Sequence, residues 1–289
     1  MKPAPFRYVA ATSIEEALAL KAEHGDEAKF LAGGQSLVPA MNFRMAQPAV
    51  LIDLNGLNVL AYVKADGKTV RIGALTRYRT LQRNSTIAGQ ATLMAEALPE
   101  VAHPAIRNRG TLGGNLSHAD PASELPAVVL ALGGTLHARS KKGARTIAAK
   151  DFFAGVLTTA LAAEELLTEI ELPVLPARSG TSFIEVARRR GDYAMMGVAC
   201  TVTLDANDAC SDVRLAYCNA GETPVAAPRA AQALQGQRID ESTARAAAET
   251  AKSEIRPFGN VHASAAYQRH LAGVLTRRAL LAAYGRARL

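Results

Sequence analysis

Ala32-Gly33-Gly34-Gln35-Ser36 and Thr111-Leu112-Gly113-Gly114-Asn115 are two glycine-rich segments about eighty residues apart, and they guide the interpretation of the whole chain. Each combines a Gly-Gly step with a small hydroxyl and an amide side chain. Because glycine has no Cβ atom, such a backbone can approach a phosphate closely and point its N–H groups at the oxygens. Two such turns match a ligand with two phosphates, so a dinucleotide is the natural candidate.

The sequence around the two glycine turns supports this interpretation. Lys29-Phe30-Leu31-Ala32 predicts a short buried strand that leads into the first turn, and the second turn follows the basic stretch His103-Pro104-Ala105-Ile106-Arg107-Asn108-Arg109. Beyond the second turn, Asp120 is a good N-cap and Pro121 fits the first position of a helix. Neither segment has the G-x-G-x-x-G pattern that opens a βαβ unit, so a Rossmann site is not expected. Ordinary strand-end turns are the alternative, because glycine marks turns everywhere.

The composition limits the class of protein. The chain has 289 residues, 49% of them hydrophobic, and can hold one large domain or two ordinary ones. Its basic residues are dispersed and often paired with acids, so the net charge of +7 does not indicate nucleic-acid binding. No apolar run approaches the roughly 20 residues that cross a bilayer, and Met1-Lys2-Pro3-Ala4-Pro5 lacks the apolar core of a signal peptide. We expect a cytoplasmic protein without a membrane span.

Residues that commonly bind metals or act as nucleophiles do not have the spacing of a known metal site or catalytic motif. Cys200, Cys210 and Cys218 lack CxxC spacing and neighbouring histidines, which favours buried free thiols over an iron–sulfur or zinc site. The six histidines are scattered, so no metal ligand is predicted. No Ser-His-Asp or Cys-His arrangement is suggested, and no catalytic residue is assigned. Redox chemistry in this chain would therefore need a bound carrier.

The hydrophobic pattern mixes helices with strands throughout, which indicates an α+β protein. In the first half we expect helices from Ser13 to Gly25 and over 126–132, and a mostly helical stretch over 80–100. Single strands are expected at 29–32 and 50–54. Two hairpins are expected, one of 60–63 and 69–73, and one of 135–139 and 146–148 around a solvated basic loop. Two prolines and a Ser-Gly step predict a boundary near residues 172–180. Strands near 181–187, 196–204 and 213–219 follow, and the last sixty residues are expected to be helical.

These residues also carry a resemblance to a known family. The chain resembles the FAD-binding medium subunit of the molybdenum hydroxylases, the carbon monoxide dehydrogenase and xanthine dehydrogenase type. The similarity runs essentially end to end and is densest in residues 29–39, 107–126, 165–173 and 188–197. Both glycine motifs stand at the family's spacing. The resemblance implies a p-cresol methylhydroxylase-type FAD-binding domain over residues 1–175, with subdomains of about 1–56 and 57–175, and a small C-terminal α+β domain over 176–289.

The resemblance also implies roles for individual residues. Ala32, Gly33, Gly34, Gln35 and Ser36 are expected to wrap the pyrophosphate of FAD. From the second subdomain the ligand is expected to be held by Thr111, Gly113, Gly114 and Asn115. Four further positions match cofactor contacts of the family: Lys29 on the adenine side, Glu124 at a polar part of the cofactor, Leu167 near the ring system, and Tyr193 against the isoalloxazine.

Some positions keep more than one interpretation. Several family members have a lysine in the strand around residues 184–187, where this chain has Glu185, so its redox behaviour or acceptor is expected to differ. His118 fits either the FAD site or a capping and packing role. Arg107 and Arg109 fit either a phosphate contact or a surface for the partner subunit.

The resemblance implies an electron-transfer subunit with FAD as its cofactor. Its partners are expected to be a large molybdenum-cofactor subunit, which hydroxylates the substrate, and a small subunit whose [2Fe-2S] clusters pass electrons to this FAD. The FAD then reduces an external acceptor. The alternatives are a stand-alone flavin-dependent reductase of the same fold, such as an enolpyruvyl-sugar reductase, and a non-catalytic nucleotide-binding protein.

Overall fold

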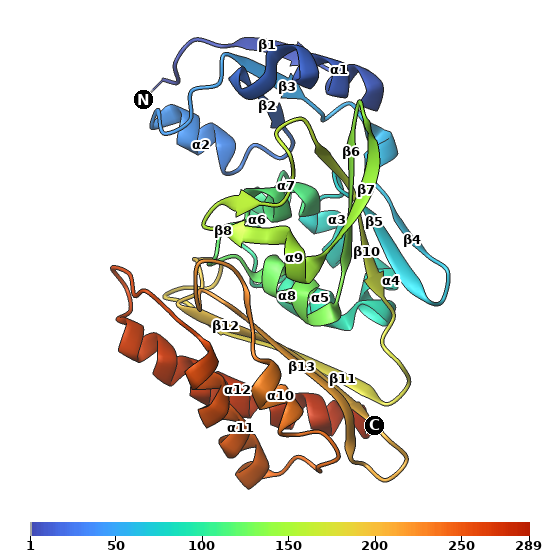
Figure 1. The fold of residues 1–289 in the computed structure, drawn as a ribbon, viewed down its shortest axis with the longest axis vertical. Helices are drawn as coiled ribbons and strands as arrows, with labels where there is room; N and C mark the ends of the chain where they lie inside the picture. The colour runs from blue at the N-terminus through green and yellow to red at the C-terminus, as the bar shows by residue number, and fades with distance from the viewer. Residues whose placement is uncertain (1) are drawn as a thin grey trace.

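A computed structural model describes residues 2–289, and in it the chain forms three parts that follow one another along the long axis (Figure 1). The N-terminal part is a three-stranded parallel sheet of order β1-β3-β2, covered by helix α1. Ser13 caps α1 by accepting a hydrogen bond from the Glu16 N–H at 3.1 Å, and Gly25 ends it with a φ of +51°. The elements of this part are β1 (Arg7–Ala10), α1 (Ile14–His24), a 3₁₀ turn η1 (Gly25–Glu27), β2 (Ala28–Leu31), α2 (Leu37–Asn42) and β3 (Val50–Asp53).

The central part is a five-stranded antiparallel sheet of order β4-β5-β10-β6-β7, with helices packed on one face. In Figure 1 the sheet lies to the right of these helices. The strands are β4 (Val63–Ala65), β5 (Thr69–Gly73), β6 (Thr135–Ser140), β7 (Gly143–Ala148) and β10 (Leu166–Pro173), with the short pair β8 (Phe153–Gly155) and β9 (Thr158–Thr159). The helical elements are η2 (Asn58–Leu60), α3 (Tyr78–Gln82), α4 (Ser85–Gln90), α5 (Thr92–Ala97), α6 (Pro104–Arg107), α7 (Leu112–His118), α8 (Glu124–Leu132) and α9 (Ala149–Phe152).

The C-terminal part is an antiparallel sheet of order β11-β12-β13-β14 with long helices on its outer face. All nine residues of β12 are buried, because α11 and α12 cover one face of this sheet and the helices of the central part cover the other. The elements are β11 (Ser179–Val186), β12 (Met196–Leu204), β13 (Cys210–Cys218), β14 (Val225–Ala226), α10 (Pro228–Gln232), α11 (Glu241–Glu254) and α12 (Ala265–Ala287).

A polar latch ties the central part to the C-terminal part. The Glu96 carboxylate on α5 accepts hydrogen bonds from the Phe183 N–H of β11 at 3.1 Å and from Arg286 of α12 at 2.6 Å. The Thr181 hydroxyl also donates to it. One side chain therefore connects a central helix with both layers of the C-terminal part.

The α+β class, both hairpins, the C-terminal helices and the mostly helical stretch over 80–100 agree with the sequence prediction. That stretch is divided into three short helices by turns near Asn84 and Ala91. Other local predictions are wrong. Asp120 and Pro121 do not begin a helix: Asp120 accepts a hydrogen bond from the Ala122 N–H in a turn, and α8 starts only at Glu124. The strand expected at 60–63 begins at Val63, and the basic loop is a two-residue turn between β6 and β7. Strands β1 and β10 were not predicted.

Candidate functional site: a glycine-lined anion pocket

The first glycine segment connects β2 to α2, and its two glycines meet different steric demands. Gly34 has a φ of +73°, which side-chain-bearing residues rarely adopt. At Gly33 an added Cβ would lie 2.6 Å from the Arg109 carbonyl oxygen. The Gln35 amide donates to the Gly33 carbonyl at 3.0 Å and fixes the turn. The backbone N–H groups of Gly34, Gln35 and Ser36 donate to no other described residue, so they are available to a ligand.

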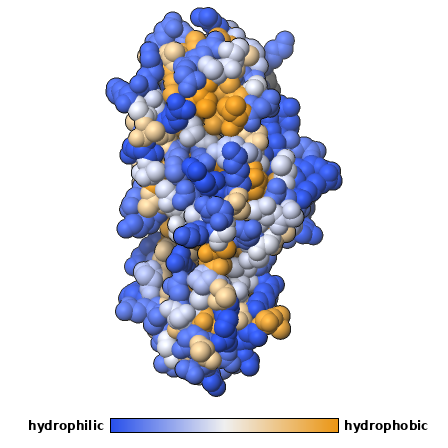
Figure 2. Space-filling view, turned by 90° about the vertical axis from the view of Figure 1, so that its right-hand side faces the viewer, coloured by the Kyte–Doolittle hydropathy of each residue, from blue (hydrophilic) through white to orange (hydrophobic). Residues whose placement is uncertain are grey.

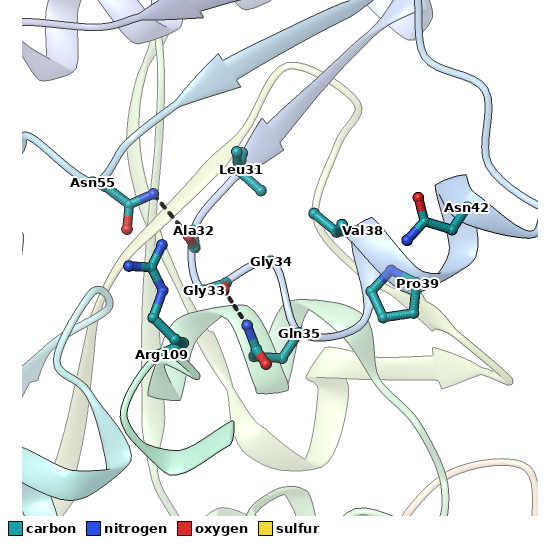
Figure 3. A pocket seen from close by; sticks show the side chains of 10 residues that line it. All are labelled: Leu31, Ala32, Gly33, Gly34, Gln35, Val38, Pro39, Asn42, Asn55 and Arg109. Carbon is teal, nitrogen blue, oxygen red and sulfur yellow. Dashed lines mark hydrogen bonds between the residues drawn. The ribbon is translucent and has the colours of Figure 1, made fainter. Parts of the chain in front are cut away.

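A cavity of about 300 Å³ opens beside this turn (Figure 3). Arg109 contributes a guanidinium to its wall, and Asn55 donates to the Ala32 carbonyl at 3.0 Å. Arg77 donates to both the Asn55 side chain and the Arg109 carbonyl, which links the two sides of the cavity. Its lining residues are Leu31, Ala32, Gly33, Gly34, Gln35, Val38, Pro39, Asn42, Asn55 and Arg109. Free N–H groups beside a cation make this cavity suitable for a phosphate.

The second glycine segment is the first turn of helix α7, whereas the sequence predicted a glycine turn like the first one. Thr111 is its N-cap and accepts the Gly114 N–H at 3.2 Å. The N–H groups of Leu112 and Gly113 are also satisfied within the protein, by the carbonyls of Thr76 at 3.1 Å and Ala74 at 2.8 Å. These N–H groups are therefore already engaged, unlike those of the first turn.

The glycines of the second segment bring α7 close to its neighbours. An added Cβ on Gly113 would lie 2.4 Å from the Ala74 Cβ, so the helix can pack on the β5 end only without a side chain there. An added Cβ on Gly114 would lie 3.6 Å from the Ala32 Cβ, which places the two glycine motifs against each other. Gly114 and Asn115 are partly exposed, whereas Thr111 and Gly113 are buried.

Asn115 has one unsatisfied atom. Its amide nitrogen donates to the Ser123 hydroxyl at 2.7 Å, but its Oδ1 is buried without a hydrogen-bond partner among the described residues. A buried acceptor without a partner costs roughly 1–3 kcal/mol. A ligand that donates a hydrogen bond here would remove that cost.

The other predicted residues occupy different environments. Glu124, the first residue of α8, is 4% exposed, and burial together with Asp120 and Glu100 raises its pKa to about 7. Tyr193 lies in the loop after β11 and is 63% exposed, and partial burial and the neighbouring Asp120 raise its pKa to about 12. Glu124 contributes to that shift as well, so the buried Glu124 carboxyl lies in the same region of the structure as Tyr193 and Asp120.

Lys29 and Leu167 do not line the cavity beside the first turn. Lys29 is exposed on β2, and Leu167 is 3% exposed within the core of the central part. Lys29 stands two residues before the lining residue Leu31, but the structure brings neither the Lys29 nor the Leu167 side chain to the cavity.

The structure separates the two arginines that the sequence left undecided. Arg107 donates to the carbonyls of Val101 at 3.0 Å and Ala102 at 2.5 Å, so it stabilises the preceding turn. Arg109 instead lines the cavity. Sequence reasoning missed Asn55, Arg77 and the α2 residues of the wall. In the sequence, the Asn55-Gly56 step indicates only a turn, and no local pattern indicates that Arg77 reaches Asn55.

Comparisons with known proteins identify the family. Residues 4–175 match the family described as "FAD binding domain in molybdopterin dehydrogenase", and residues 181–283 match "CO dehydrogenase flavoprotein C-terminal domain". The chain belongs to this family of FAD-binding subunits of molybdenum hydroxylases.

Curated relatives and solved structures agree with this assignment. The chain is 42% identical over 288 residues to the 6-hydroxypseudooxynicotine dehydrogenase complex subunit alpha of Paenarthrobacter nicotinovorans, covering 100% of this chain and 97% of that protein. It is 45% identical over 227 residues to the caffeine dehydrogenase subunit beta of Pseudomonas sp. (strain CBB1), covering 78% and 76%. A chain of carbon monoxide dehydrogenase from Hydrogenophaga pseudoflava superposes with a TM-score of 0.96 at 36% identity and covers 99% of both chains.

The expected class of protein is therefore confirmed. The chain is an FAD-binding, electron-transferring subunit of an oxidoreductase complex, with a large molybdenum subunit and a small iron–sulfur subunit as partners. The fold is the one expected from the resemblance. Among residues 2–289, no helix combines the length and apolarity that a membrane crossing requires.

Proposed function

We propose that the cavity at the first glycine turn holds the pyrophosphate of FAD in this chain, and that the ring system extends from there towards Tyr193 and Glu124. The proposal is carried mainly by the free N–H groups of Gly34, Gln35 and Ser36 beside the Arg109 guanidinium. A phosphate oxygen would accept from these N–H groups while the cation offsets its charge.

The second glycine motif has a different proposed task. Its N–H groups are engaged within the protein, so Thr111 and Gly113 would act by placing α7 next to the first turn. Gly114, which has no side chain, would let the cofactor approach the helix backbone closely. Asn115 would accept a hydrogen bond through its unsatisfied Oδ1. Lys29 and Leu167, which do not line the cavity, are proposed to act at the adenine end and near the rings.

Bound FAD supplies the redox chemistry, since it can exchange electrons with one-electron clusters and with a two-electron acceptor. The protein contributes binding, orientation and the exclusion of water. Tyr193 is exposed and aromatic, which suits a position over a flat ring. The buried carboxyl of Glu124, with its raised pKa, can carry a proton at neutral pH and donate a hydrogen bond.

We further propose that the FAD-binding domain ends at residue 175 and the C-terminal domain spans 176–289. The separate core of the outer C-terminal layer supports this division. A cytoplasmic location is proposed as well, and three free, buried cysteines favour a reducing compartment.

Cofactor binding is tested by the visible spectrum of the chain purified with its partner subunits, followed by heat release and chromatography of the flavin. We expect about one FAD per copy of this chain. A pure, folded complex that takes up no FAD, even from an excess, would contradict the proposal. Colourless protein would favour a non-catalytic nucleotide-binding role, and substrate reduction without partners would favour a stand-alone reductase.

The placement of the pyrophosphate is tested by Arg109→Ala. Losing one charged phosphate contact should weaken FAD binding about tenfold while the melting temperature of the FAD-free chain stays unchanged, because the Arg109 side chain is exposed. The matched control is Arg83→Ala, which removes an exposed arginine that does not line the cavity. Equal FAD affinity in both variants would refute the assignment of Arg109.

A further inference from the structure

A second cavity, of about 420 Å³, lies on the opposite face of the central sheet from the helices α3–α8. It is bounded by Ile14 of α1 and by Val59 and Leu60 of η2 on one side, and by residues of β5, β6, β7 and β10 on the other. In Figure 2 this side of the molecule faces the reader, and an apolar group in its upper third adjoins hydrophilic side chains below. Neither the cofactor nor the family description assigns a task to this cavity.

Three potential metal ligands meet on this face of the sheet. Glu169 and Glu171 are two residues apart on β10, so their side chains emerge on the same face. His137 is the β6 partner of Glu169 in the strand register. One ligand atom from each of the three residues lies within 4.8 Å of the others.

The separations fit ligands of one ion. The His137 Nε2 lies 3.6 Å from the Glu169 Oε1 and 3.4 Å from the Glu171 Oε2. Two ligands about 2.1 Å from a tetrahedral zinc ion are about 3.4 Å apart. These distances are long for a hydrogen bond, and the His137 Nε2 is indeed buried without a hydrogen-bond partner among residues 2–289. An ion that enters between these groups would therefore displace no hydrogen bond of this nitrogen.

We propose that His137, Glu169 and Glu171 form a binding site for a divalent transition-metal ion of the zinc class. Imidazole and carboxylate ligands suit such an ion, and water from the cavity would complete its coordination. The Tyr62 hydroxyl donates to the Glu169 Oε2, which orients this carboxylate and leaves its Oε1 facing His137.

The Arg71 guanidinium competes with a metal ion for the two carboxylates of this site. Its Nη2 lies 2.6 Å from the Glu169 Oε1, and its Nε lies 3.7 Å from the Glu171 Oε2. Because its side chain is 49% exposed, it can move into solvent when an ion enters. Arg71 therefore offsets one of the two carboxylate charges in the metal-free protein, and it lowers the affinity of the site for metal by its like charge.

The test is calorimetric titration of the full-length, chelator-treated chain with zinc chloride at about pH 7.5, where imidazole is normally neutral. We expect one zinc ion per chain. His137→Ala should weaken binding at least about tenfold, because it removes one of three ligands. Arg71→Ala should strengthen binding by about tenfold, because it removes the competing cation. The control, His270→Ala, alters an exposed histidine of α12 and should leave the affinity unchanged.

Opposite shifts in the two site variants support the proposal. Absence of zinc binding, equal affinity in His137→Ala and wild type, or weaker binding in Arg71→Ala would overturn it. Glu171→Gln provides a second variant if His137→Ala fails to fold, since Glu171 is 32% exposed and lies outside the Tyr62–Glu169 contact. Its melting curve without zinc shows whether the fold is intact, and unchanged zinc affinity in a folded Glu171→Gln chain would also overturn the proposal.

Discussion

Glu185 on β11 has a carboxyl group whose two oxygens are buried and make no hydrogen bond to residues 2–289, and its replacement gives an informative stability measurement. Gly197 is its register partner on β12, and Cys218 lies next to Gly197 on β13, so these two neighbours offer the carboxyl no cation. Burial, followed by the charges of Glu124 and Glu100, raises the pKa of Glu185 to about 9. We expect Glu185 to be a neutral acid at pH 7.

The expected pH dependence follows from proton binding. An unfolded glutamate loses its proton near its ordinary pKa of 4.5, whereas native Glu185 keeps it up to about pH 9. Between these values the native state binds one more proton, so stability falls as pH rises, by about 1.4 kcal/mol per pH unit at most. Over three pH units this amounts to about 4 kcal/mol, an upper bound because water can reach the carboxyl when the sheet relaxes. The amide of Glu185→Gln does not titrate in this range, so this variant should lose less stability than wild type as the pH rises.

The assay is urea unfolding of the full-length chain at several values between about pH 5.5 and pH 8.5. Wild type should lose about 2–4 kcal/mol more than Glu185→Gln across this range. Glu124, whose pKa is raised to about 7, gives a slope of the same sign, but this slope is present in both proteins. Glu222→Gln, which replaces an exposed glutamate, should follow the wild-type curve. Identical pH slopes for Glu185→Gln and wild type would refute the neutral-acid argument.

Two further predictions concern packing. Glu96→Ala removes the latch to β11 and α12. It leaves the buried Phe183 N–H unpaired and the Arg286 guanidinium with only the Thr181 carbonyl as an acceptor, and it should cost about 2–3 kcal/mol in urea unfolding. Glu100→Ala, which breaks only an ion pair with a largely exposed arginine, should cost less than about 1 kcal/mol, and equal losses would contradict the latch. Gly113→Ala, whose Cβ would meet a neighbouring Cβ at 2.4 Å, should destabilise the chain by about 1–3 kcal/mol. Gly89→Ala in α4 is the control, because an added Cβ there meets open space, and it should stabilise the chain by about 0.5–1 kcal/mol. If Gly113→Ala costs no stability, α7 can shift to make room and the packing argument is refuted.

Local sequence patterns predicted much of the fold and part of the site. Ser13 and Gly25 bound the first helix as expected, because capping depends on residues within one turn. The first glycine turn was recognised for the same reason, since its shape depends on a few consecutive residues. The division of residues 80–100 into three helices was not predicted. Asn84 begins the second of them by accepting a hydrogen bond from the Ile87 N–H at 3.2 Å, and neither interruption contains a glycine or proline that would have marked it.

The sequence by itself determined the α+β class, the two glycine motifs and the resemblance to FAD-binding subunits, because these are features of order and spacing along the chain. Only the tertiary structure decided that Arg109 lines the anion cavity while Arg107 supports a turn. It also decided that the Glu185 carboxyl is enclosed with no hydrogen-bond partner among residues 2–289, and that His137 meets two glutamates more than thirty residues away. The physical reason is that burial and ligand geometry depend on which distant strands pair, and strand pairing is fixed by the packing of the whole sheet.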